Sequence, residues 1–154
     1  MALLSVAGLL YYAFVGPFLS KEEKQVRSAI KTAIDANATE IPLIGVLDVE
    51  WEHVCIVAPY INKREFKKTL GYDPVSYGAM DRWNNEEQYW TLAFVTKARN
   101  IVPIRILKVE LGTYSLPRGE WMRCVPRDRA ILQYDKRVNY DVPGVFTLIE
   151  NVKR

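Results

Sequence analysis

Residues 51–60, WEHVCIVAPY, form the segment around which we expect the rest of the chain to fold. Beyond its third residue, apolar side chains occupy both alternating faces of an extended chain, which is typical of a strand that is buried on both sides. Read with a period of two, Trp51, His53 and Cys55 share one face. Pro59 lacks an amide donor and ends the strand. The segment therefore predicts a central strand, which carries the chain's only histidine and one of its two cysteines.

Two segments have the pattern of amphipathic helices. In residues 20–35, Ser20 and Glu23 have the spacing of a capping box, and apolar side chains then recur every four residues. Residues 62–70 predict a shorter helix that begins at a capping asparagine and ends before Gly71. Each helix has one apolar stripe, so we expect each to pack against a sheet.

The remaining pattern predicts an antiparallel sheet. Residues 97–100 are a polar connection between two apolar runs, which is typical of a β-hairpin. Residues 112–126 contain two prolines and two glycines and predict an irregular segment. We expect the further strands at residues 89–96, 101–111, 130–134 and 144–150. The predicted fold class is α+β, with one antiparallel sheet of four to five strands and both helices packed on one of its faces.

The N-terminal segment, residues 2–19, contains no charged residue. A helix of this length reaches about 27 Å, close to the thickness of the bilayer core, so residues 1–19 predict a membrane anchor ahead of a single α+β domain at 20–154. A cleaved signal peptide and a core helix are the alternatives. Four basic residues within residues 21–31 favour a cytoplasmic flank by the positive-inside rule, so the orientation stays open.

The two cysteines, Cys55 and Cys124, can form a single intramolecular pair. In an exported domain such a bridge would close a loop of roughly 70 residues and stabilise the fold by about 4 kcal/mol. In a cytosolic protein both would be buried thiols. The compartment therefore decides between a disulfide and two free cysteines.

A basic segment follows the predicted hairpin. Residues 97–137 contain ten basic and four acidic side chains. This excess of positive charge is compatible with an anionic partner or with a solvated sheet surface. Arginine and tryptophan are enriched at the energetic centres of protein interfaces, and no nucleic-acid-binding motif frames the segment, so we expect a protein partner. The predicted binding residues are Arg118, Trp121, Arg123, Arg127 and Arg129.

Catalytic and metal-binding patterns are weak. His53 and Cys55 lie two residues apart on one strand without a third orienting group, which favours a structural histidine. The carboxylates of Asp81, Glu86 and Glu87 lie near aromatic residues and could serve a hydrolase as acid and base. One histidine and two distant cysteines do not make a zinc site, and we expect no metal and no cofactor. We expect a protein that is not an enzyme.

Three sequence features together resemble small exported or membrane-anchored bacterial proteins of unknown function. The features are Trp51-x-x-Val54-Cys55-x-x-x-Pro59-Tyr60, the apolar run at residues 92–95, and Cys124-x-Pro126-Arg127-x-x-Ala130. The resemblance implies a periplasmic domain in which the two cysteines pair, and it implies no activity. The chain differs from many such proteins in lacking a lipid-attachment cysteine.

These observations predict a non-catalytic, membrane-anchored domain that binds another protein. An immunity or inhibitor protein, or an accessory subunit of an envelope complex, would fit this description. The alternatives are an envelope hydrolase and a small structural subunit of a membrane assembly. The domain is expected in the periplasm or outside the cell, with the cytoplasmic orientation left open by the basic flank.

Overall fold

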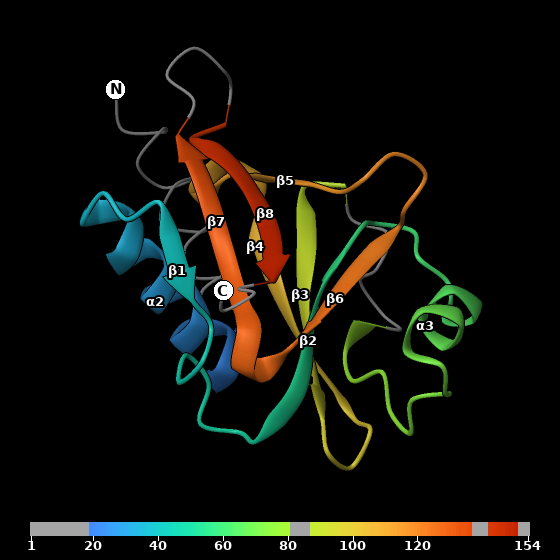
Figure 1. The fold of residues 1–154 in the computed structure, drawn as a ribbon. Helices are drawn as coiled ribbons and strands as arrows, with labels where there is room; N and C mark the ends of the chain where they lie inside the picture. The colour runs from blue at the N-terminus through green and yellow to red at the C-terminus, as the bar shows by residue number, and fades with distance from the viewer. Residues whose placement is uncertain (1–18, 81–86, 137–141, 151–154) are drawn as a thin grey trace, which may run out of the picture.

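The computed structural model describes residues 19–80, 87–136 and 142–150. Within these residues the strands form two four-stranded sheets, in the orders β1-β7-β8-β5 and β4-β3-β2-β6 (Figure 1). The strands are β1 (Glu40–Pro42), β2 (Trp51–Val57), β3 (Tyr89–Thr96), β4 (Ile101–Leu107), β5 (Thr113–Ser115), β6 (Met122–Pro126), β7 (Ala130–Lys136) and β8 (Gly144–Glu150). The predicted α+β class is confirmed, but the prediction of a single sheet is wrong.

The two sheets share one hydrophobic core. Leu132 and Phe146 from the first sheet pack in the same cluster as Ile56 and Phe94 from the second. The chain passes from one sheet to the other through a short 3-10 helix, η2 (Arg127–Arg129), directly between β6 and β7. A single long sheet would have left one face of these strands uncovered, whereas two facing sheets bury both sets of apolar side chains.

β2 is the predicted buried central strand, with β3 on one side and β6 on the other. We predicted that Trp51, His53 and Cys55 lie on one face of this strand, and this prediction is wrong for Trp51. The pairing with β3 shifts between Trp51 and His53, so Glu52 is the extra residue of a β-bulge. Trp51 therefore packs in the core between the sheets, whereas Cys55 packs on the opposite face of β2.

Both predicted helices are present, α2 (Lys21–Asp35) and α3 (Lys63–Leu70). They lie on different faces of the second sheet, which corrects the prediction that they share one. Val26 of α2 packs in the core between the sheets, and Phe66 of α3 packs with Cys55 and Ala93 on the other side. Figure 1 shows the two helices at opposite sides of the molecule. Because β2 and β3 are apolar on both faces, each face requires its own cover.

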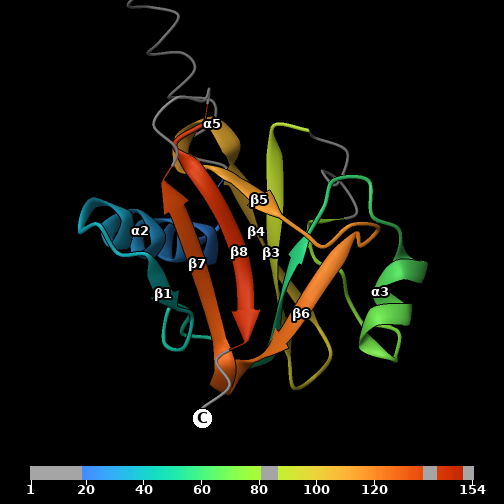
Figure 2. The same cartoon turned by 45° about the horizontal axis from the view of Figure 1, so that its top comes forward.

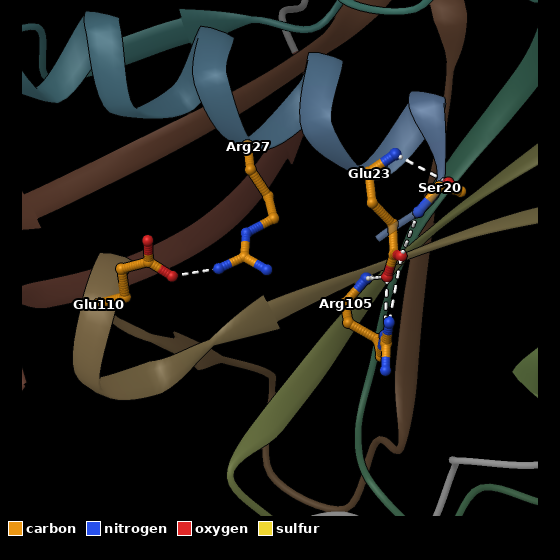
Figure 3. Close-up of polar contacts among 5 residues, drawn as sticks. All are labelled: Ser20, Glu23, Arg27, Arg105 and Glu110. Carbon is orange, nitrogen blue, oxygen red and sulfur yellow. Dashed lines mark hydrogen bonds and ion pairs between the residues drawn. The ribbon is translucent and has the colours of Figure 1, made fainter. Parts of the chain in front are cut away.

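A buried ion pair fixes the start of α2 to β4 (Figure 3). Ser20 and Glu23 form the predicted capping box, and the Glu23 carboxylate also accepts from Arg105, whose Nε lies 2.8 Å from Oε1. Burial by itself raises the pKa of Glu23. The hydrogen bonds from the Arg105 side chain and the Ser20 amide, together with the Arg105 charge, outweigh burial and hold this pKa below its usual value. Glu23 is therefore an ionised carboxylate inside the fold.

The segment at residues 112–126 is more regular than predicted. A short helix, α5 (Lys108–Leu111), precedes it, and the segment itself contains β5 and β6. β6 pairs antiparallel with β2 along its whole length. Its sequence, MRCVP, includes an arginine and a proline, which hide the strand pattern.

Cys55 and Cys124 form a disulfide across the β2–β6 pair, with their Cα atoms 4.0 Å apart. The pairing that the resemblance implied is therefore confirmed, and it indicates an oxidising environment outside the reducing cytosol. The predicted anchor, residues 1–19, lies outside the described residues except for Leu19. Among the helices that the structure describes, none has the length and apolar character needed to cross a membrane.

Candidate protein-binding groove

A groove of about 430 Å³ lies between α3 and β6. Figure 2 shows β6 between α3 on one side and β8 on the other, and β6 contacts both elements. The α3 side contributes Glu65, Lys68 and Thr69. The opposite side is formed by residues 119–125, and Glu150 at the end of β8 also lines the groove.

Strand pairing and a disulfide both join β6, the floor of the groove, to β2. The strands pair residue by residue, with Ile56 opposite Arg123 and Val57 opposite Met122. The disulfide adds a covalent link at Cys124, which itself lines the groove. A binding surface on a fixed strand loses little conformational entropy when a partner docks, so this floor is suited to recognition.

Trp121 is the most exposed aromatic side chain of the groove. Its backbone is fixed, because the Trp121 carbonyl accepts from the Ala58 amide at 2.9 Å, yet 57% of the residue's surface is exposed. Gly119, with φ at 83°, supplies the tight turn that presents it. Tyr60, two residues after Ala58, is 54% exposed. Two large aromatic residues thus reach solvent at the same end of the β2–β6 pair.

The charges around the groove are mixed. Arg123, half-buried on β6, and Lys68 on α3 supply positive charge. Glu65, Glu120 and Glu150 supply negative charge. An aromatic anchor surrounded by charges of both signs is the usual composition of a protein interface, with apolar centre and polar rim.

The structure separates the five predicted binding residues. Trp121 and Arg123 line the groove, and Arg118 lies in the exposed turn just before it. Arg129 pairs with Glu150, with Nη1 2.5 Å from Oε1, so its charge is already engaged in a surface ion pair. Arg127 lies against Trp51 and lines a different hollow. The predicted residues therefore divide between the groove along β6, which Arg129 contacts through Glu150, and a second hollow at the C-terminal end of β6, which Arg127 lines.

Neither the α3 side of the groove nor the exposure of Tyr60 was predicted from the sequence. Lys68 and Thr69 lie on the polar face of an amphipathic helix, which is the ordinary solvent face of such a helix. The confirmed cysteine pair is the signal that could have found them. Once β6 is placed beside β2, the helix that directly follows β2 is the nearest element to cover its outer face.

The residues considered for catalysis are not brought together among the described residues. Cys55 is bonded to Cys124 and so is not a thiolate nucleophile. Asp81 and Glu86 lie outside the described residues. Glu87 accepts a hydrogen bond from the Tyr60 hydroxyl at 3.0 Å, and this bond raises the pKa of Tyr60. In the part of the chain that the structure describes, no three His, Cys, Asp or Glu side chains gather as metal ligands.

No protein family model, no curated protein and no solved structure matches the chain.

Proposed function

We propose that this chain is a non-catalytic domain that binds another protein through the groove between α3 and β6. The observation that carries the proposal is Trp121, a large aromatic side chain left 57% exposed on a backbone that is hydrogen-bonded into the sheet. Tryptophan and arginine are the side chains that most often dominate the affinity of protein complexes. Here Trp121 and Arg123 line the same hollow.

The location of the domain is part of the proposal. The disulfide supports an exported domain, and the uncharged residues 2–19 support a membrane anchor that keeps it at the membrane. A periplasmic or extracellular domain of this kind would serve as an immunity or inhibitor protein, or as an accessory subunit of an envelope complex. Each of these roles requires recognition of one protein and no chemistry.

Site-specific photocrosslinking in the native host tests this proposal. A benzophenone side chain is placed at Thr69, which lines the groove, and in a second variant at Arg64, an exposed position on the same helix that does not line it. We expect one discrete protein adduct from position 69 and none from position 64. The matched pair holds the helix, the probe and the expression level constant.

Two further substitutions make the test specific. Trp121→Ala and Arg123→Glu, each combined with the probe at position 69, should reduce the adduct at least about tenfold, because each removes a central contact. Retention of the disulfide in both variants controls for folding. Equal adducts from positions 64 and 69, or an adduct that survives both substitutions, would contradict the proposal.

A further inference from the structure

A second hollow lies at the C-terminal end of β6, and it shares no lining residue with the groove. Its volume is about 450 Å³. It is lined by Ile44, Trp51, Glu52, His53, Pro126, Arg127 and Asp128. The β-bulge at Glu52 and the start of η2 meet here, because His53 pairs with Pro126. Bulges often re-aim side chains next to binding sites.

Trp51 forms the inner wall of this hollow. Only 1% of its surface is exposed, and its ring is held edge-on against Phe94, with centroids 5.0 Å apart and planes at 75°. Its Nε1–H is covered from solvent and has no hydrogen-bond partner among the described residues. Trp90, which is also 1% exposed, donates its Nε1–H to the Gly112 carbonyl at 2.9 Å. The indole N–H of Trp90 therefore has a hydrogen-bond partner, whereas that of Trp51 has none among the described residues.

Two neighbouring side chains share this property. The Arg127 guanidinium lies over the Trp51 ring, with Cζ 5.6 Å from the centroid, and its Nε has no partner within the described part of the chain. His53 Nδ1 is also covered and has no partner there. Tryptophan and arginine side chains only donate hydrogen bonds, and buried donors in folded proteins are nearly always satisfied. Two buried donors at a single hollow thus lack an acceptor within the described part of the chain, whereas His53 Nδ1 can donate or accept according to its tautomer.

We infer that this hollow is a binding site for the carboxylate of a ligand that carries an apolar group beside it. The two oxygens of a carboxylate can accept from Trp51 Nε1–H and from Arg127 together, and arginine favours such two-point contact. The site supplies one full positive charge, from Arg127. Glu52 and Asp128 also line the hollow, and Asp128 is offset by Arg129, whose Nε lies 3.8 Å from Asp128 Oδ1. The remaining carboxylate of Glu52 opposes any anion and opposes a dianion such as phosphate more strongly than a carboxylate, so the ligand's charge must contact Arg127 directly.

The apolar part of the ligand follows from the remaining wall. Ile44 is 58% exposed and lines the hollow next to Pro126. An aliphatic group attached to the carboxylate would cover this side chain. Arg127 is half-buried and its guanidinium lies over the Trp51 ring, so admission of the ligand requires this side chain to turn outward and to bring its charge onto the carboxylate. The site goes beyond the proposed groove and does not depend on it.

Two sources share this chemistry, a free branched aliphatic acid and the C-terminal carboxylate of a peptide that ends in an aliphatic residue. The probes are isovalerate for the first, N-acetyl-leucine for the second, and N-acetyl-leucine amide as the uncharged control. Each is added to the ¹⁵N-labelled protein at constant ionic strength, and the indole N–H signals of the four tryptophans are followed by NMR. Sodium chloride and sodium phosphate serve as anion controls.

We expect a saturable downfield shift of the Trp51 indole proton with isovalerate or N-acetyl-leucine. The amide and chloride should leave it in place, and so should phosphate. Trp90, whose N–H is already bonded, and the distant Trp121 should not move. Tighter binding of N-acetyl-leucine than of isovalerate would assign the site to a peptide C-terminus, and the reverse order to a free acid.

Arg127→Gln should weaken binding at least about tenfold, whereas Arg118→Gln, an exposed arginine outside the hollow, should not. Ile44→Ala provides a second variant that leaves the buried residues intact, and it should weaken binding several-fold. A Trp51 signal that ignores both acids would overturn the inference. A response that is equal for chloride, or larger for phosphate, would overturn it as well.

Discussion

Arg105 and Arg127 lie at opposite edges of the second sheet, Arg105 in β4 and Arg127 directly after β6. Each places its guanidinium carbon 5.6 Å from the centre of an aromatic ring, that of Tyr89 in one case and that of Trp51 in the other. The Arg105 side chain donates twice to the Glu23 carboxylate, at 2.8 Å and 3.2 Å. Arg127 Nε has no partner among the described residues. The distance from guanidinium to ring is therefore the same for both arginines, whereas only Arg105 has a hydrogen-bond partner for its Nε among the described residues.

The difference distinguishes an arginine whose hydrogen bonds stabilise the fold from one that, as we propose, binds a ligand. Removal of Arg105 would leave the buried Glu23 carboxylate without its positively charged partner, which is strongly destabilising. The pair therefore fixes α2 on β4. At Arg127 the buried Nε has no partner in the described part of the chain, and a buried donor without a partner costs about 1–3 kcal/mol. Proteins keep costs of this kind where function requires them.

Removal of the disulfide should loosen the Arg127 edge selectively. The bridge joins cysteines 69 residues apart and ties β6 to β2, so the double variant Cys55→Ala, Cys124→Ala should lose about 4 kcal/mol of unfolding free energy in urea. Hydrogen exchange should accelerate more in β6 than in β4. Reduction of the unmodified protein by dithiothreitol is the matched control and should give a similar loss. Equal acceleration at both edges would contradict the contrast.

Loss of the buried carboxylate should destabilise the Arg105 edge. Glu23→Ala leaves the Arg105 guanidinium without its partner, and we expect a loss of about 3 kcal/mol in chemical denaturation. Lys24→Ala, at an exposed position of the same helix, should change the unfolding free energy by less than about 0.5 kcal/mol. If the two variants lost similar amounts, the Glu23–Arg105 pair would not be the fixing contact.

The same carboxylate should give the protein a specific acid sensitivity. The pKa of Glu23 is lower in the folded chain than its usual value of 4.5. At a pH between these two pKa values, the folded state therefore binds fewer protons than the unfolded state. Its contribution to stability is complete above the unfolded pKa and is lost as the pH falls through the folded pKa. Between pH 5 and pH 3 the unfolding free energy should fall more steeply for the unmodified protein than for Glu23→Gln. Identical slopes would show that Glu23 is not the linked group.

Local patterns predicted those elements whose signals lie within a few residues. The capping box of α2 and the asparagine cap of α3 were readable because both partners of each cap are three residues apart. The hairpin of β3 and β4 and the strands β7 and β8 also follow from alternation and turn residues. The segment at residues 51–57 was correctly predicted as a buried strand, except for the bulge, because an extra residue leaves no mark in a periodic pattern.

The contacts that define the candidate sites depend on distant parts of the chain. Glu23 and Arg105 are 82 residues apart, and no local pattern pairs them. Trp51 meets Arg127 because β6 pairs with β2, and the arginine and proline of β6 concealed that strand. The cysteine pair contained the missing information. With Cys55 opposite Cys124, an antiparallel register places His53 opposite Pro126, and Arg127 then follows beside Trp51.

Substitution of Arg105 and of Arg127 by methionine compares the two arginines in one measurement of stability. Methionine keeps the apolar stem of either side chain and removes its donors. Arg105→Met strands the buried Glu23 carboxylate and should lose about 3 kcal/mol of unfolding free energy in urea. Arg127→Met removes an unsatisfied donor and should stay within about 1 kcal/mol of the unmodified protein, or gain stability. Equal losses from the two substitutions would mean that Arg127 stabilises the fold just as Arg105 does, and would contradict the account.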